Sequence, residues 1–122
     1  MDALGHINNV AIARIYEEAR VQFHMNRLGR AAAPGTENWG TVVVDVQMTF
    51  LKSVTYPSTL EAGVGVGQIG RSSFTLLMAL FEDGECVGTS DVVTVITQGG
   101  QAIPIPDDIR TALEKLEIPS GA

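Results

Sequence analysis

The spacing of apolar residues changes once along this chain, and that change constrains the fold more than any other feature. Before residue 29 the apolar residues recur every three or four positions, as on the buried face of a helix; they are Ile12, Tyr16, Ala19 and Phe23. From residue 39 onward apolar residues alternate at period two, as in half-buried strands. A single switch of this kind predicts an α+β protein in which one long helix packs against an antiparallel sheet.

The boundaries of these elements follow from turn and cap signals. We expect the helix over roughly residues 9–28, with Asn8 or Asn9 as its N-cap and Gly29 as its end. About four strands follow, over residues 39–52, 60–69, 74–81 and 87–97, and short connections favour a meander-like order. One face of the first strand is expected to hold Val42, Val44, Val46, Met48 and Phe50. Asp107 or Asp108 is expected to cap a short final helix through Leu116.

Size and charge exclude several classes of function. The 122 residues, 45% of them hydrophobic, fit one domain over residues 1–122 with a buried core. A net charge of −6 without a basic stripe argues against nucleic-acid binding. No apolar run is long enough to span a membrane, no signal peptide is evident, and Cys86 is the single cysteine. We therefore expect a cytoplasmic protein without disulfides or membrane contacts.

Residues 65–70 read G-V-G-Q-I-G, which formally matches the fingerprint of dinucleotide-binding sites. That fingerprint requires a tight turn into a helix, whereas Gly63, Gly65 and Gly67 continue the alternation of a strand. We therefore expect these glycines to mark curvature or a close approach of the backbone. No spacing of His, Cys or carboxylate residues indicates a metal site.

The segment before the helix carries the most specific motif. Residues 2–9 read D-A-L-G-H-I-N-N, and E-E-A-R follows at residues 17–20. This pattern resembles the opening of hot-dog-fold acyl-CoA thioesterases of the 4-hydroxybenzoyl-CoA thioesterase-like group. Further along the chain, Tyr56-Pro57, Ile69-Gly70 and Ser72-Ser73 resemble parts of the second and third strands of that family. The resemblance implies a hot-dog fold, in which a curved antiparallel sheet packs around the central helix.

A strand usually precedes the Asp in that family, whereas only Met1 precedes Asp2 here. Either the sheet is one strand short or the protein begins further upstream. Ile12 also stands where the family's helices often have Tyr, which bears on the acyl pocket.

The resemblance implies hydrolysis of an acyl-CoA thioester to a free acid and coenzyme A. Such a reaction needs a nucleophile or a base that activates water, and positive potential at the carbonyl oxygen. Asp2 is expected to fill either first role, and the amides at the helix start near Asn8 and Asn9 to polarise the carbonyl. His6 would orient the carboxylate or water, or bind the substrate. Catalysis is therefore assigned to Asp2, His6 and Asn9.

The same resemblance gives the candidates for substrate binding, which are Asn8, Tyr16, Lys52, Arg71 and Ser72. Lys52 and Arg71 are the only cations between Arg30 and Arg110, so we expect them to contact the CoA phosphates. No cofactor is expected, because coenzyme A is part of the substrate. Similar proteins build each active site from two subunits, so a homodimer or homotetramer is expected.

Two other functions stay open. One is the activity of the hot-dog enoyl-thioester hydratases or dehydratases, in which an Asp and a His lie five residues apart within a segment that contains Asn-Pro. Asp2 and His6 are four residues apart, which disfavours this similarity. A non-catalytic acyl-thioester-binding protein would bind acyl-CoA without releasing thiol.

Adjacent Glu17 and Glu18 point about 100° apart on a helix and cannot act as a paired acid and base. His24 is expected to be solvated.

Overall fold

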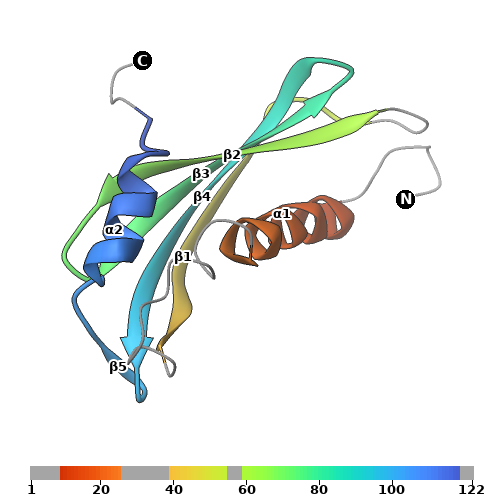
Figure 1. The fold of residues 1–122 in the computed structure, drawn as a ribbon. Helices are drawn as coiled ribbons and strands as arrows, with labels where there is room; N and C mark the ends of the chain where they lie inside the picture. Colours follow the sequence, from red (N-terminus) through yellow and green to blue (C-terminus); the bar gives the residue numbers. More distant parts are fainter. Residues whose placement is uncertain (1–8, 26–38, 55–58, 119–122) are drawn as a thin grey trace.

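The computed structural model describes residues 9–25, 39–54 and 59–118. In these ranges helix α1 precedes the sheet and helix α2 follows it (Figure 1). The elements are α1 (Asn9–Phe23), β1 (Trp39–Phe50), β2 (Leu60–Ile69), β3 (Ser73–Glu82), β4 (Glu85–Gln98), β5 (Gln101–Ala102) and α2 (Asp107–Glu114). The predicted α+β class is confirmed as an antiparallel sheet with two helices. The question of a first strand before Asp2 lies outside the described residues.

The strands lie in the order β1-β4-β3-β2, and every pair in this path is antiparallel. The two-residue β5, which the sequence reasoning missed, pairs with β4. The meander prediction is correct for β2 to β4 and wrong for β1, which lies beside β4 at the opposite edge from β2. Residues 51–59 are long enough to carry the chain across, since nine residues reach about 30 Å and three strand spacings need about 14 Å.

The turn between β3 and β4 follows its sequence signal. Asp83 and Gly84 both have positive φ, at 50° and 88°. This left-handed pair matches the right-handed twist of the two strands that it joins, and glycine adopts it without strain. The hairpin fixes the register in which β3 and β4 present their side chains.

A β-bulge in β1 changes which of its side chains share a face. Val43 pairs with Thr94 and Asp45 with Val93, so Val44 is an extra residue between two ladder positions. The prediction that Val42 shares a face with Val46, Met48 and Phe50 is therefore wrong. Because the bulge shifts the alternation by one residue, Val43 joins that face instead.

The core lies between α1 and one face of the sheet. The predicted helical stripe is confirmed for Ile12, Tyr16 and Phe23, which are buried. From the sheet the same cluster holds Val66, Phe74, Leu76, Met78, Leu80, Val87, Val92 and Ile96. The α2 residues Ile109 and Leu113 belong to it, as do Val54 and Ile105, which lie outside the helices and strands. α1 ends at Phe23, and residues 24–25 continue it as a π-helical turn. Residues 26–28 of the predicted helix lie outside the described part.

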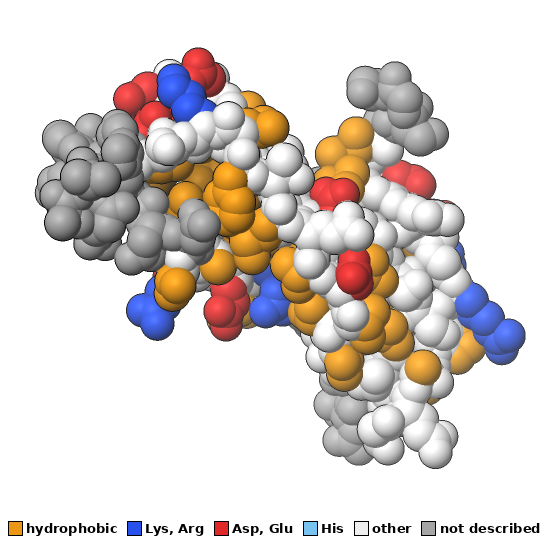
Figure 2. Space-filling model, turned by 180° about the vertical axis from the view of Figure 1, so that it is seen from behind, with side chains coloured by type: hydrophobic (Ala, Val, Ile, Leu, Met, Phe, Trp, Pro, Cys, Tyr) orange, Lys and Arg blue, Asp and Glu red, His pale blue; other side chains and the backbone are white. Residues whose placement is uncertain are grey.

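The two edges of the sheet differ in what covers them. Beside β2, Val66 donates to the carbonyl of Leu116 and Ile118 donates to the carbonyl of Val66, so the chain after α2 occupies that edge. β1 pairs on one side only among the described strands. Large apolar side chains stay exposed on β1, namely Val42, Val44, Val46 and Phe50, and Leu51 directly after it is exposed as well. Figure 2 shows that apolar side chains gather in patches on the face that it draws.

The glycine-rich strand does not bind a nucleotide in the manner of its fingerprint. Residues 60–69 form β2 and the next element is β3, so no helix follows Gly70 as the fingerprint requires. The predicted close approach is confirmed at Gly65, where an added Cβ would lie 2.3 Å from Cδ1 of Ile118. None of the helices in the described ranges is long and apolar enough to cross a membrane.

Candidate active site

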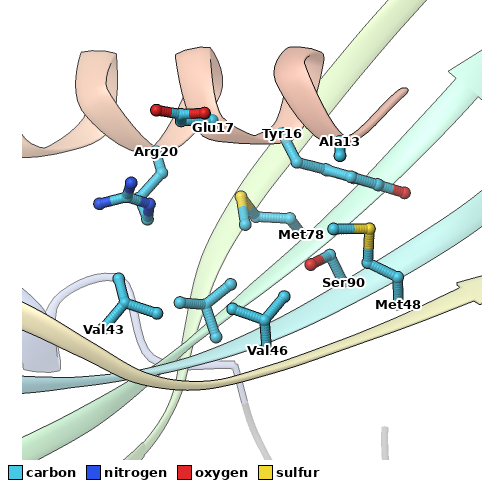
Figure 3. A pocket seen from close by; sticks show the side chains of 10 residues that line it. Ala13, Tyr16, Glu17, Arg20, Val43, Val46, Met48, Met78 and Ser90 are labelled. Atoms are coloured by element: carbon cyan, nitrogen blue, oxygen red, sulfur yellow. The ribbon is translucent and has the colours of Figure 1, made fainter. Parts of the chain in front are cut away.

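A cavity of about 230 Å³ lies between α1 and the sheet (Figure 3). Its walls are mostly apolar, and four polar side chains reach it. The lining residues are Ala13, Tyr16, Glu17 and Arg20 from α1, with Val43, Val46, Met48, Met78, Ser90 and Val92 from the sheet. The cavity begins one helical turn after the start of α1, about 6 Å along the helix axis from Asn9.

Ser90 is the polar group on the sheet side of this cavity. It pairs with Met48 of β1 and Met78 of β3, so the three side chains form one row across the inner face of the sheet. Ser90 is 0% exposed, and its Oγ has no hydrogen-bond partner among the described residues. Leaving a buried hydroxyl without a partner costs about 1–3 kcal/mol. Figure 3 shows this hydroxyl directed into the space between Met78 and Val46.

Tyr16 supplies the second buried hydroxyl, from the helix side. Its ring is 3% exposed, and its Oη also lacks a hydrogen-bond partner in the described part of the chain. Desolvation by burial, and to a smaller extent the nearby Cys86, raises the pKa of Tyr16 to about 12. The phenol is therefore protonated at neutral pH and available as a donor. Gly88 leaves room for it, since a Cβ there would lie 3.1 Å from Oη.

Glu17 and Arg20 place opposite charges at the helix side of the cavity. Glu17 is exposed and Arg20 is half-buried. Figure 3 shows the Arg20 guanidinium extending from α1 toward the sheet on the side of Val43. The other side chains that line the cavity are uncharged.

The predicted catalytic residues, and Asn8 of the predicted substrate-binding residues, fall at or outside the margin of the described chain. Asp2, His6 and Asn8 lie outside it, and Asn9 is the first residue of α1. The assignments of these four residues therefore stay predictions. Among the predicted substrate-binding residues that the structure describes, Tyr16 is the one that lines the cavity.

The two cations predicted to contact the CoA phosphates, Lys52 and Arg71, lie toward opposite ends of β3. Lys52 lies near the start of β4, where its amide donates to the carbonyl of Val87. Its Nζ forms an ion pair with Oε1 of Glu85 at 2.6 Å. Arg71 is exposed before β3, and its carbonyl accepts from Ile105. The ten residues of β3 separate these two ends by about 30 Å. The assignment of both side chains to the phosphates of one CoA molecule therefore stays a prediction.

Ser72 lies with Arg71, where its carbonyl accepts from the amide of Ile96. This is the end of the sheet where α1 finishes, since the His24 ring contacts the Phe74 ring with centroids 6.3 Å apart. Lys52 instead lies toward the other end, where the Tyr16 hydroxyl approaches Gly88. Of the predicted cations, Lys52 is thus the one on the side of the helix start.

Sequence reasoning missed Ser90 as a cavity residue. The signal was present in the alternation of β4, where Ser90, Val92, Thr94 and Ile96 occupy successive inward positions. A hydroxyl at an inward position is unusual enough to be noted, because buried polar groups normally need a partner. The cavity itself could not be inferred, because it depends on how Met48 and Met78 pack around the serine.

The sequence profile of the thioesterase-like superfamily matches residues 1–113 of this chain. The chain belongs to that superfamily. Membership in this thioesterase-like superfamily supports thioester hydrolysis as the general activity and confirms the predicted enzyme class. The matched range includes the D-A-L-G-H-I-N-N segment, α1 and all strands. Among proteins with curated functions, none matches the chain significantly in sequence.

Solved structures agree with the superfamily assignment. A thioesterase from Thermus thermophilus, solved with coenzyme A and zinc, is 26% identical, with a TM-score of 0.80 over 95% of this chain and 84% of that one. A thioesterase-superfamily protein from Jannaschia sp. CCS1 is 27% identical, with a TM-score of 0.78 over 93% and 73%. A predicted thioesterase from Bacillus stearothermophilus is 24% identical and supports the fold, with a TM-score of 0.83 over 98% and 90%.

No group of three His, Cys, Asp or Glu side chains that could hold a metal ion is found within the described ranges of this superfamily member. The absence of a metal or cofactor from the reaction stays a prediction.

Proposed function

We propose that this protein hydrolyses an acyl-CoA thioester, with the Asp2 carboxylate and the start of α1 as its catalytic centre. The superfamily match carries the proposal, because it includes Asp2. The apolar cavity supports it, since it lies along α1, the helix that directly follows the D-A-L-G-H-I-N-N segment. An acyl chain whose carbonyl lies at the helix start would enter the cavity after about 6 Å.

The chemistry needs few groups. The N–H groups of the first helical turn have no acceptor within the helix, and they would stabilise the charge that develops on the carbonyl oxygen. With Asp2 as general base, water loses a proton to the carboxylate and adds to the carbonyl carbon. The C–S bond then breaks, and the leaving thiolate takes up the proton. With Asp2 as nucleophile, the carboxylate attacks the carbonyl carbon and the C–S bond breaks, which releases the CoA thiolate and leaves a mixed anhydride on Asp2. Water then hydrolyses the anhydride to the free acid and restores the Asp2 carboxylate.

Coenzyme A is proposed as the thiol on two grounds. The predicted motif resembles acyl-CoA thioesterases, and the similar thioesterase from Thermus thermophilus was solved with coenzyme A. Lys52 is the proposed phosphate contact on the side of the helix start, where its ion pair with Glu85 would exchange for one with phosphate. Arg71 and Ser72 would serve a CoA bound at the other end of the sheet.

A homodimer formed through β1 is proposed as the working unit. β2 is covered at its edge by residues 116–118, whereas the outer side of β1 has no strand partner among the described residues. A long apolar edge strand is a template for pairing with another chain. Val43, Val46 and Met48 of β1 line the cavity, so a partner along β1 would adjoin the site.

Asp2→Asn tests the catalytic proposal. The amide cannot act as a base or a competent nucleophile, so thiol release from acyl-CoA should fall by about a hundredfold or more. Binding of a thioether analogue of acyl-CoA, which cannot be hydrolysed, should change less than about threefold, because the reacting carboxylate contributes little to ground-state binding. Asp2→Glu is the matched control and should keep partial activity. Near-normal turnover in Asp2→Asn would remove Asp2 from the mechanism, and analogue binding without thiol release by the wild type would indicate a non-catalytic binding protein.

A further inference from the structure

The inner face of β4 carries two buried hydroxyls with no hydrogen-bond partner among the described residues, Ser90 and Thr94. Both are 0% exposed and lie on the same face of the same strand, four residues apart. They differ in one respect: Ser90 lines the cavity between α1 and the sheet, whereas Thr94 does not. The pair therefore separates the effect of a buried hydroxyl from the effect of a hydroxyl that faces the cavity.

The protein around Ser90 offers it little. Its cross-strand neighbours are the thioethers of Met48 and Met78, which are weak acceptors, and the next row of the cavity is Val46 and Val92. The backbone groups of β4 are engaged with β1 and β3 on both sides. The hydroxyl points into the cavity, where a bound molecule would meet it (Figure 3).

The cavity has the size of a short acyl group. Its volume of about 230 Å³ corresponds to about seven or eight water molecules, each comparable in size to one methylene group. Valine and methionine side chains suit the carbon skeleton, and Ser90 is the polar exception on the sheet side. A serine hydroxyl both donates and accepts, so it matches a hydroxyl or keto oxygen on the ligand.

From these contacts we propose that Ser90 is a specificity-determining residue, which selects acyl groups bearing a hydroxyl or keto oxygen over their unsubstituted counterparts. The proposal rests on the proposed thioesterase function and adds the substrate class. An unsubstituted acyl chain would displace water from the cavity and leave the Ser90 hydroxyl buried without a partner. An oxygen-bearing chain would satisfy that hydroxyl, so the preference arises from the unpaired group in the protein.

The test uses matched pairs of acyl-CoAs that differ by one oxygen, such as butyryl and 3-hydroxybutyryl, or phenylacetyl and 4-hydroxyphenylacetyl. For at least one pair, kcat/KM of the wild type should favour the oxygenated member. In Ser90→Ala that ratio should fall about five- to tenfold, the range of one hydrogen bond. Thr94→Val removes the other hydroxyl and should leave the ratio unchanged. Thermal unfolding of both variants confirms that each is folded at the assay temperature.

Binding of the corresponding thioether analogues separates this proposal from the proposed function. A Ser90-dependent preference in binding without any hydrolysis would overturn the thioesterase activity and support the role of Ser90. Hydrolysis with the same ratio in wild type and Ser90→Ala would overturn the role of Ser90 and indicate that water satisfies its hydroxyl. An equal loss of the ratio in Thr94→Val would also overturn it, because the effect would then be a general one on β4.

Discussion

At the scale of single residues, His24 differs most from its expected setting. The sequence places it beside Arg20 on a helix and predicts a solvated side chain, but the structure packs it against Phe23 and Phe74, with Nε2 buried and unpaired among the described residues. Burial, and secondarily the Arg20 charge, lowers the pKa of His24 below its ordinary value of 6.5. The histidine is therefore neutral in the folded protein at neutral pH.

His24 should make the protein less stable in mild acid. Because the pKa is lowered only in the folded state, the unfolded chain binds the proton first as the pH falls below 6.5. The contribution is fully present above pH 6.5 and is lost as the pH falls toward the folded pKa. Urea unfolding at about pH 7.5 and about pH 5.0, on either side of the ordinary histidine pKa, should show a larger loss for wild type than for His24→Gln. Equal losses in the two proteins would contradict the burial of this ring.

At the scale of elements, the contact between the Tyr16 side chain of α1 and Gly88 of β4 contributes to the position of the cavity. Gly88 is buried in β4 opposite Phe50, and a Cβ at this position would lie 3.0 Å from the carbonyl oxygen of Thr49 and 3.1 Å from the Tyr16 hydroxyl. A backbone carbonyl cannot rotate away as a side chain can. The absence of a side chain at Gly88 therefore lets the helix and the strand approach closely enough for Tyr16 to line the cavity.

Gly88→Ala should destabilise the fold by about 1–3 kcal/mol, the usual cost of overpacking a core. Gly63→Ala is the matched control, since its Cβ would be 3.6 Å from the Phe81 ring, an ordinary contact. Chemical unfolding of both variants measures the difference, and Gly88→Ala should also raise KM by displacing Tyr16. A Gly88→Ala protein as stable as Gly63→Ala would mean that α1 shifts freely on the sheet.

At the scale of the whole molecule, the outer edge of β1, which has no strand partner among the described residues, is the basis of the proposed assembly. The exposed apolar residues of this strand include Val44, the bulged residue, at 57% exposure. With residues 116–118 beside β2, the two edges are not equivalent. Pairing through β1 would produce a closed dimer with a two-fold axis rather than an open chain of subunits.

Val44→Lys should convert the proposed dimer into a monomer without unfolding it, because a lysine on an edge strand opposes pairing. Light scattering coupled to size-exclusion chromatography should give twice 13.0 kDa for wild type and 13.0 kDa for the variant. Val21→Lys on α1, also exposed and apolar, is the control and should stay dimeric. A monomeric wild type, or a Val44→Lys protein that stays dimeric, would refute pairing through β1.

The sequence by itself determined the class of fold and the order of elements. Period-two and period-3.6 patterns report which side of a segment is buried, and strong turn signals such as Asp83-Gly84 mark where segments end. The start of α1 at Asn9 and the bounds of β2, β3 and β4 were therefore predicted to within two residues. The D-A-L-G-H-I-N-N segment pointed to the superfamily that the profile match confirms.

Only the tertiary structure decided the place of β1, the face of Val42 and the setting of Ser90. The partner of an edge strand depends on where a connection crosses the sheet, and the bulge at Val44 depends on the ladder with β4. Neither the strand partner nor the bulge can be inferred from the spacing of apolar residues along the chain. The cavity likewise forms between elements far apart in the sequence, so its one hydroxyl from the sheet becomes visible only when Met48, Ser90 and Met78 lie side by side.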